Sequence, residues 1–476
     1  MSQFRHTYLT TTLPYVNADP HIGFALEIIQ ADIMVRYFEM IGDKVFFNTG
    51  TDEHGLKIYR KALENNEDVQ EYVNRYADKF KSLMPALGIY RDINFIRTTD
   101  ENHIKAAQEF WNRCLKNGDI YKKFYEIKYC VGCENEKTES ELENGKCPLH
   151  PTTPIETIAE ENYCFKFSAY KEKLLALYEE NPFFVRPESR MNEIFSFVSR
   201  GLQDFSISRK KEKMPWGIPV PGDDSHVMYV WFDALVNYVS AIGFPDNMEM
   251  FDRWWPVIQF AGKDNLRHQS AIWQAMLMSA KLPPSSQIII HGMVLVNGEK
   301  MSKSVGNVIN PLSIVSQYGN EPLRYFLARE MSTFEDSDFT DEKFKEAYNA
   351  GLANGIGNLT SRIMKMSTTH LDKGEEGVVD ILPEQFVEAM RVYDIKKAYD
   401  YVWERIASLD RLIQEEEPFK VIKESKDLGE AMIRKLLNEL FIIATMLEPL
   451  LPETSRKIKN AIKENEMPAV LFPRKD

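Results

Sequence analysis

The sequence predicts an α/β fold, in which a parallel, Rossmann-like sheet is interrupted by an inserted segment and followed by an all-α bundle. Three observations lead to this prediction. Strand-like and helix-like segments alternate up to residue 117, the alternation lapses over 118–226 and then resumes, and strand signals nearly vanish after Glu342. Such alternation is typical of parallel strands joined by helical crossovers.

The first strand is expected at Thr7–Leu13, a run rich in β-branched residues that ends before a proline. Asp19 and Pro20 then suggest a helix start, with the aspartate as cap and the proline in the first turn. Gly42 suggests the end of that helix, and a second strand is expected at 44–48.

Further strands are expected at His226–Phe232, Val257–Ala261 and Gln287–His291, each followed by helix-like sequence. After Glu342, apolar residues recur at helical spacing, which predicts a helical bundle. We therefore expect five parts: the first half of the sheet domain (1–117), an insert (118–226), the second half of the sheet domain (227–293), a linking segment (294–345) and the bundle (346–476).

Composition indicates a globular protein outside the membrane. The chain has 476 residues, 44% of them hydrophobic, and its net charge is −13. We find neither an apolar run of about 20 residues nor an apolar N-terminal signal core, so a cytoplasmic location is expected. The acidic balance does not indicate a nucleic-acid partner, which would need local basic surface such as Arg209–Lys213 or Lys457–Lys463. Either run can equally be a solvated face.

A cluster of three cysteines and one histidine has the spacing of a zinc knuckle. The candidate ligands are Cys130, Cys133, Cys147 and His150. Four nitrogen and sulfur ligands make a closed tetrahedral site, which predicts one structural Zn²⁺ and leaves no open position for a catalytic water. Cys114 and Cys164 stand apart and are interpreted as core thiols.

Two short motifs carry groups suited to a polyphosphate. His21 stands in the first turn of an expected helix beside Gly23, where free N–H groups and the helix dipole favour an anion. Lys300 and Lys303 lie in a serine-containing segment that would bring positive charge to developing negative charge on phosphates. Alone, His21 reads more simply as a cap or packing residue. With the lysines present, we interpret all three side chains as catalytic groups of a nucleotide-phosphate site.

These motifs belong to an ordered set that resembles the methionyl-tRNA synthetases, class I aminoacyl-tRNA synthetases, with a single zinc knuckle. The matching segments, besides the zinc cluster, are Leu13–Asn17, His21–Gly23, Thr49–Gly55, Pro215–Pro219, Tyr229–Ala234, Gly262–Asp264, Lys300–Ser304, Gly357–Arg362 and Leu450–Thr454. The resemblance spans nearly the whole chain. It implies ATP-dependent attachment of methionine to its tRNA through a methionyl-adenylate, as translation initiation and elongation require.

The resemblance also implies roles for individual residues. The methionine pocket would comprise Leu13, Tyr15, Asp52, Trp231, Ala234, Tyr238 and Trp273. Its aromatic walls suit a polarizable thioether, and the aspartate would pair with the α-ammonium group. ATP, with its Mg²⁺, would be bound by His21, Gly23, Gly262, Asp264 and Lys303. The anticodon would be read by Asn358, Arg362 and Phe419, which makes the bundle an anticodon-binding domain.

Three positions depart from the family pattern. Phe24 replaces the usual second histidine of the first motif, which puts one phosphate contact in question. Gln269, next to His268, stands where many members place a pocket histidine. Phe419 replaces a tryptophan that would stack on an anticodon base. The chain also ends soon after Phe472, without the module that dimerises some relatives, so a monomer is expected.

Two other readings remain open at this point. A synthetase for leucine, isoleucine or valine would share this core, but it would carry a larger editing insert than 118–226 can hold. A non-catalytic tRNA-binding paralogue would fit the altered Phe24, although Asp52 and the lysine segment argue against it.

Overall fold

The computed structural model describes residues 5–133, 135–137, 141–301, 306–374 and 382–475. The chain divides into two compact units: unit 1 comprises Met1–Pro20, Asp43–Met84 and Asp92–Ile290, and unit 2 comprises His21–Gly42, Pro85–Arg91 and His291–Asp476. Among the described helices, we find none with the length and apolar content needed to cross a membrane.

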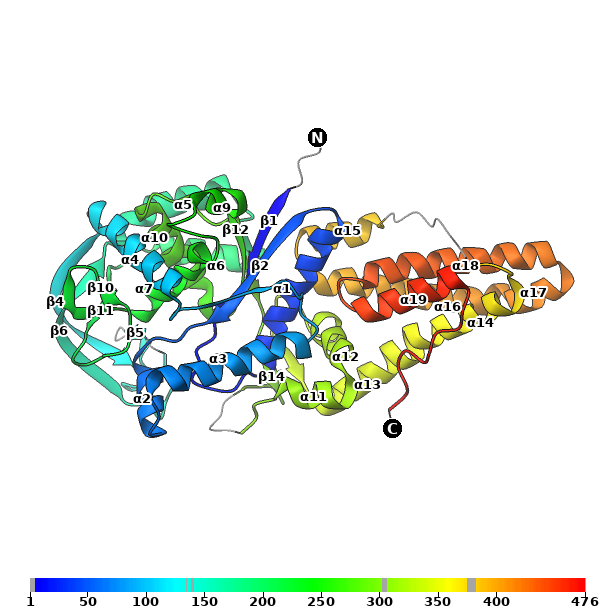
Figure 1. Ribbon diagram of the computed structural model, residues 1–476, viewed down its shortest axis with the longest axis horizontal. Coiled ribbons are helices and arrows are strands. Elements are labelled where there is room, and N and C mark those ends of the chain that lie inside the picture. Colours follow the sequence, from blue (N-terminus) through cyan, green and yellow to red (C-terminus); the bar gives the residue numbers. More distant parts are fainter. Residues whose placement is uncertain (1–4, 134, 138–140, 302–305, 375–381, 476) are drawn as a thin grey trace. The chain divides into compact units, whose positions relative to one another are not determined.

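Unit 1 is built on a six-stranded sheet, drawn in Figure 1. The strand order is β3 (Asn94–Arg97), β2 (Lys44–Thr51), β1 (His6–Thr10), β12 (Val257–Gly262), β13 (Gln287–His291) and β7 (Val185–Arg186). The pairs β1–β2, β2–β3, β1–β12 and β7–β13 are parallel. All six residues of β12 are buried, as expected for a central strand covered on both faces. The predicted parallel sheet is therefore confirmed, and its edge strand β7 comes from the segment 118–226.

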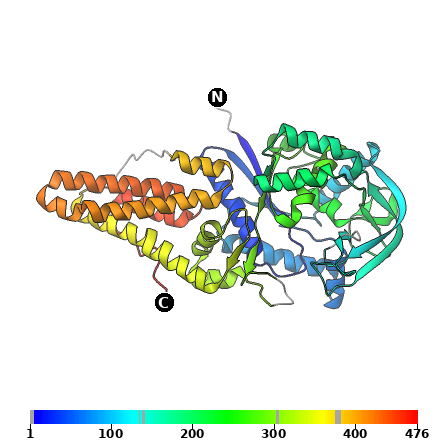
Figure 2. The ribbon, with the colours of Figure 1, turned by 180° about the vertical axis from the view of Figure 1, so that it is seen from behind.

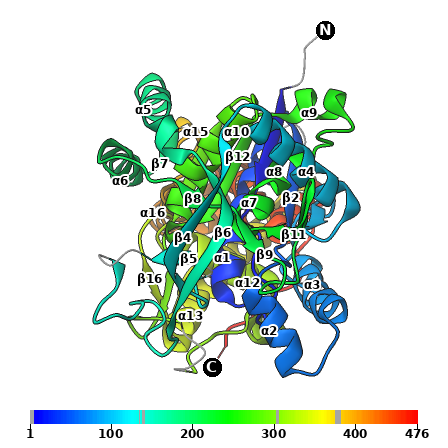
Figure 3. The same ribbon diagram turned by 90° about the vertical axis from the view of Figure 1, so that its left-hand side faces the viewer.

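That segment also forms a four-stranded antiparallel sheet of β5 (Asn135–Lys137), β4 (Ile120–Cys130), β6 (Ile155–Phe165) and β8 (Phe205–Ser206). β4 and β6 pair along their full length, and Figure 3 shows them side by side. Two further short strands, β9 (Ser208–Lys210) and β10 (Pro219–Val220), flank β11 (Asp223–Met228).

Several expectations about element boundaries are wrong. The strand expected at Thr7–Leu13 ends at Thr10, and the strand expected at 44–48 continues to Thr51. The strand expected at His226–Phe232 is only partly a strand, because β11 ends at Met228 and α7 (Val230–Leu235) begins at once. A short apolar run does not distinguish a strand from a buried helix, so periodicity could not separate the two. The helix expected to start at Asp19 and Pro20 instead starts at Ile22.

The remaining helices of unit 1 surround these sheets. They are α2 (Leu56–Glu64), most of α3 (Val69–Ala86), α4 (Glu101–Lys116), α5 (Lys171–Glu180), α6 (Glu188–Ser199), α8 (Asn237–Ser240), α9 (Met248–Trp254) and α10 (Trp273–Ser279). A single large apolar core joins all of these helices except α2 and α3 to the parallel sheet. Its fully buried members include Trp111 and Trp273.

Unit 2 contains helix α1 and the predicted bundle, which Figure 2 shows from behind. Its helices are α1 (Ile22–Met40), α11 (Pro311–Tyr318), α12 (Asn320–Tyr325), α13 (Asp341–Ala347), α14 (Asn358–His370), α15 (Glu384–Arg391), α16 (Ile395–Glu416), α17 (Pro418–Glu424), α18 (Lys426–Leu447) and α19 (Pro452–Glu464). A small sheet comprises β15 (Glu299–Lys300), β14 (Val294–Val296) and β16 (Ser337–Phe339). Beyond β16 we find only helices among the described residues, as the sequence predicts.

A buried polar corner joins three parts of unit 2. The Glu321 carboxylate accepts hydrogen bonds from the backbone N–H groups of Glu453 (2.8 Å) and Thr454 (3.2 Å) at the start of α19. The Arg324 guanidinium donates to the carbonyl of Leu450 (2.7 Å) after α18 and forms an ion pair with Asp32 of α1 (2.7 Å). The carboxylate lies at the start of one helix and the guanidinium near the end of another, where the helix dipoles favour a negative and a positive charge respectively. The Leu450–Thr454 motif is therefore the point where α12 and, through it, α1 are tied to the bundle.

Candidate active site

The seven residues predicted to bind methionine all belong to unit 1. Leu13 and Tyr15 follow β1, and Asp52 follows β2 immediately. The other four lie on or next to short helices: Trp231 and Ala234 on α7, Tyr238 on α8 and Trp273 at the start of α10. Because β1 and β2 are parallel neighbours, their carboxyl ends meet at one edge of the sheet, where α/β proteins bind ligands.

Several of these residues contact one another. The rings of Tyr15 and Trp231 lie 6.3 Å apart in an edge-to-face arrangement, and those of Tyr238 and Trp273 lie 5.7 Å apart. Asp52 is 3% exposed, and its backbone N–H donates to Pro14 while its carbonyl accepts from Val16. The structure thus brings Tyr15, Asp52 and Trp231 together, and Tyr238 with Trp273.

One aromatic contact of this site was missed by the sequence reasoning. The imidazole of His268 stacks on the Trp231 indole, with ring centroids 3.9 Å apart and planes inclined by 13°. Burial, followed by the charges of Arg267 and Lys137, lowers the pKa of His268 to about 4, so the ring is neutral at pH 7. Gln269 accepts a hydrogen bond from Gln259 (2.7 Å). Only the position of His268 beside Gln269 could have drawn attention to it.

The loop after β2 is held by a network around Glu53. Its fully buried carboxylate accepts hydrogen bonds from Nε and Nη2 of Arg97, at 2.7 and 2.8 Å, and from the hydroxyl of Thr51 at 2.6 Å. The Trp216 indole N–H donates to the Glu53 carbonyl (2.6 Å). A bidentate guanidinium–carboxylate pair fixes geometry as well as charge. These bonds connect the loop that carries Asp52 to Arg97 of β3 and to Trp216.

The predicted metal ligands converge in the structure. One ligand atom from each of Cys130, Cys133, Cys147 and His150 lies within 4.8 Å of every other. The Cys133 and Cys147 sulfurs are 3.5 Å apart, and His150 Nδ1 lies 3.2, 3.8 and 4.0 Å from the three sulfurs. Zn–S bonds of about 2.3 Å in a tetrahedron require edges of roughly 3.8 Å. The cluster can hold a metal ion, and its distances are consistent with zinc.

The residues predicted to hold ribose also belong to unit 1. Gly262 is the buried last residue of β12, and Asp264 is an exposed residue of the single helical turn that follows. A carboxylate just beyond the carboxyl end of a central parallel strand is suitably placed for a sugar hydroxyl.

In unit 2, His21 is the N-cap of α1. Its Nδ1 accepts a hydrogen bond from the Gly23 backbone N–H (3.1 Å), so the neutral imidazole carries its proton on Nε2, which makes that atom a donor. A Cβ added to Gly23 would lie 2.8 Å from His21 Cε1 and 3.5 Å from the Met301 methyl group. The first turn of α1 has no acidic residue. Capping and the proposed phosphate contact are therefore compatible.

The lysine motif lies close to this helix start. Met301 approaches Gly23, and the Ile22 N–H donates to the Ile309 carbonyl (3.0 Å). Lys300 is exposed on β15, and Lys303 lies outside the described residues. Phe24 is 9% exposed and belongs to the core.

The predicted anticodon residues lie on two helices of the bundle. Asn358 and Arg362 are one turn apart on α14, and Arg362 forms an ion pair with Asp410 of α16. Phe419, in the first turn of α17, is 39% exposed and is therefore not a core residue. The ion pair of Arg362 is thus with α16, whereas Phe419 lies on α17.

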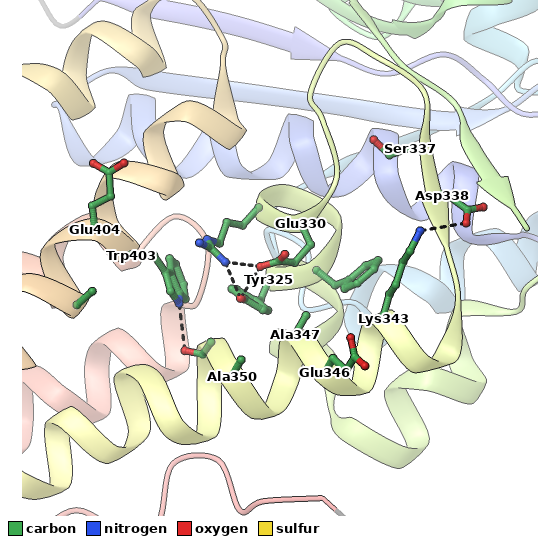
Figure 4. A pocket seen from close by; sticks show the side chains of 14 residues that line it. Tyr325, Glu330, Ser337, Asp338, Lys343, Glu346, Ala347, Ala350, Trp403 and Glu404 are labelled. Atoms are coloured by element: carbon green, nitrogen blue, oxygen red, sulfur yellow. Dashed lines mark hydrogen bonds and ion pairs between the residues drawn. The ribbon is translucent and has the colours of Figure 1, made fainter. Parts of the chain in front are cut away.

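Unit 2 also contains a cavity of about 870 Å³, shown in Figure 4. Arg329 donates to Glu330 and Tyr325 there, Lys343 donates to Asp338, and the indole of Trp403 donates to a backbone carbonyl. Of the residues predicted for substrate binding or catalysis, those that the structure describes do not contribute to its lining.

Comparisons with known proteins show which proteins this chain is similar to. The family described as "tRNA synthetases class I (M)" matches residues 7–150 and 130–364, and "Anticodon binding domain of methionyl tRNA ligase" matches 378–471. A methionine–tRNA ligase of Thermotoga maritima is 41% identical over 97% of this chain and 76% of its own length. One of Streptomyces coelicolor is 39% identical, covering 96% and 89%. The solved structure of Mycobacterium tuberculosis methionyl-tRNA synthetase with methionyl-adenylate superimposes with a TM-score of 0.92 at 35% identity, over 99% of this chain and 100% of that one.

Proposed function

Because this chain belongs to the methionyl-tRNA synthetase family, we propose that the residues gathered at the ends of β1 and β2 bind its methionine. The chain is a class I ligase that joins methionine to tRNA at the expense of ATP through methionyl-adenylate. The contact of Tyr15 with Trp231, beside the buried Asp52, is the observation that most supports the assignment. The rings would contact the thioether, and Asp52 would bind the α-ammonium group.

In the first step, a carboxylate oxygen of methionine bonds to the α-phosphorus of ATP, and the bond to pyrophosphate breaks. A carboxylate is already a nucleophile, so no protein base is needed. His21 would donate from Nε2 to a phosphate oxygen, and Lys300 and Lys303 would meet the charge that grows on the leaving pyrophosphate. Gly262 and Asp264 would hold the ribose, and Mg²⁺ would accompany the ATP phosphates.

In the second step, the 2′-hydroxyl of the terminal tRNA ribose bonds to the methionyl carbonyl carbon, and AMP leaves. Asn358, Arg362 and Phe419 would select the tRNA by its anticodon. Zinc would be held by the three cysteines and His150, where it would supply folding energy to the insert. We further propose a cytoplasmic monomer with the five-part division given above.

Exchange of labelled pyrophosphate into ATP tests the proposal when it is run with a panel of amino acids. Methionine alone should support exchange. Asp52→Asn should raise the KM for methionine, and Trp231→Ala should do the same. Exchange that is equally fast with leucine, isoleucine or valine, or unaffected by both substitutions, would contradict the pocket assignment.

A further inference from the structure

A chain of four polar side chains, each 6% exposed or less, lies on elements that carry the proposed methionine pocket or neighbour it. His54 Nδ1 lies 3.2 Å from Asp233 Oδ2, and His103 Nε2 lies 3.9 Å from Asp233 Oδ1. The other ring nitrogen of His103 is 3.0 Å from the Ser240 hydroxyl. The chain therefore connects the loop after β2, helix α7, helix α4 and helix α8, all within unit 1.

Two of the four residues, His54 and Asp233, stand close in the sequence to residues of the pocket. His54 is two residues beyond Asp52, which we assign to the substrate ammonium group. Asp233 lies between Trp231 and Ala234 on α7, which we assign to the thioether wall. The His54–Asp233 contact thus joins two segments that are far apart in the sequence and that supply opposite ends of the ligand site.

The electrostatics favour a fixed contact. Burial alone would raise the pKa of the Asp233 carboxyl, but its interactions with His54 and His103 outweigh burial and hold that pKa below its ordinary value. The neighbouring carboxylate, Glu53, has its own cation in Arg97. A buried carboxylate that stays ionised needs its partner in place, because no water is there to solvate its charge.

We propose that His54 and Asp233 are positioning residues for methionine: their buried contact holds the loop that carries Asp52 against the helix that carries Trp231 and Ala234. The inference rests on the proposed pocket. Since ammonium and thioether contacts are made in the ground state and the transition state alike, losing their alignment should raise the KM for methionine and leave kcat nearly unchanged.

The test uses His54→Gln and Asp233→Asn in the full-length enzyme. In pyrophosphate exchange, each should raise the KM for methionine about tenfold, with kcat and the KM for ATP changed less than about threefold. The double variant should be no worse than either single variant, because both remove the same contact. Additive effects, or an unchanged KM for methionine, would overturn the proposal. If Asp233→Asn does not fold, His54→Gln decides alone.

A second readout isolates the orientation of Asp52. Wild-type enzyme should bind a methionine analogue without the α-ammonium group far more weakly than methionine, and this discrimination should shrink in His54→Gln. Equal discrimination in both proteins would overturn the proposal.

The matched control is the His226–Asp223 pair, which has the same chemistry at 3.1 Å but lies on β11. His226→Gln should leave the KM for methionine unchanged, and a rise equal to that of His54→Gln would overturn the proposal. Should Asp52→Asn and Trp231→Ala raise this KM while His54→Gln does not, the pocket stands and only this inference fails.

Discussion

Replacing Arg324 with methionine should destabilise unit 2 by about 3 kcal/mol. Arg324 is 1% exposed, and its guanidinium lies 2.7 Å from the fully buried Asp32 carboxylate, 2.7 Å from the Leu450 carbonyl and 2.9 Å from the Pro449 carbonyl. Removing one partner of a buried ion pair typically costs about 3–5 kcal/mol. The lower end applies here, because Asp32 keeps Arg36 at 2.8 Å and the Tyr90 N–H at 2.6 Å.

For a unit of about 200 residues, 3 kcal/mol corresponds to a fall in Tm of roughly 6–12 °C. Differential scanning calorimetry measures this for the transition of unit 2. The control is Arg405→Met, which removes an ion pair with Glu439 whose side chains are 28% and 35% exposed. Such a pair contributes about 0–1 kcal/mol, so its Tm should fall by no more than about 4 °C. Equal shifts in the two variants would refute the claim that the buried corner stabilises unit 2.

Four further outcomes are expected. Phe419→Ala should slow tRNA charging by about tenfold and leave pyrophosphate exchange intact, since base stacking contributes roughly 1–3 kcal/mol; a parallel loss of both reactions would assign the residue to the fold. Lys303→Ala should slow single-turnover adenylation about 100- to 1000-fold with methionine affinity retained, and the reverse pattern would contradict a transition-state role. Removing the metal with a chelator should raise the KM for methionine, because Val131 of the knuckle packs in one cluster with Tyr15 and Trp231. Metal analysis checks that removal is complete, and an unchanged KM after complete removal would speak against that coupling. The folded-state pKa of His268, about 4, lies below its unfolded value of about 6.5, so the unfolded chain binds the extra proton and stability should fall as the pH drops from 6.5 to 4. His268→Phe keeps the ring stacking and should remove this pH dependence of stability in denaturant titrations. The same pH dependence in both proteins would exclude His268 as its source.

The local sequence determined those features that depend on short-range pattern. A buried parallel strand is read from a continuous apolar run, and both Val257–Ala261 and Gln287–His291 are strands of the sheet. Two ligand pairs with two residues between their members predict a metal knuckle, because such spacing lets each turn aim both ligands at one point. The four ligand atoms do converge. Family resemblance, carried by ordered motifs, led to the function that the relatives share.

Only the tertiary structure decided which distant groups meet. Periodicity gave no reason to pair Asp32 with Arg324, His54 with Asp233 or Arg362 with Asp410, since each pair joins different elements. The same holds for the stacking of His268 on Trp231. For the apolar run after Met228, local composition leaves strand and helix equally open, and the tertiary structure makes it a helix. A buried charge is stable only where the fold supplies its partner. The sequence therefore shows that Asp233 is present, while the packing of α4, α7 and the loop after β2 places two histidines beside it and lowers the pKa of its carboxyl.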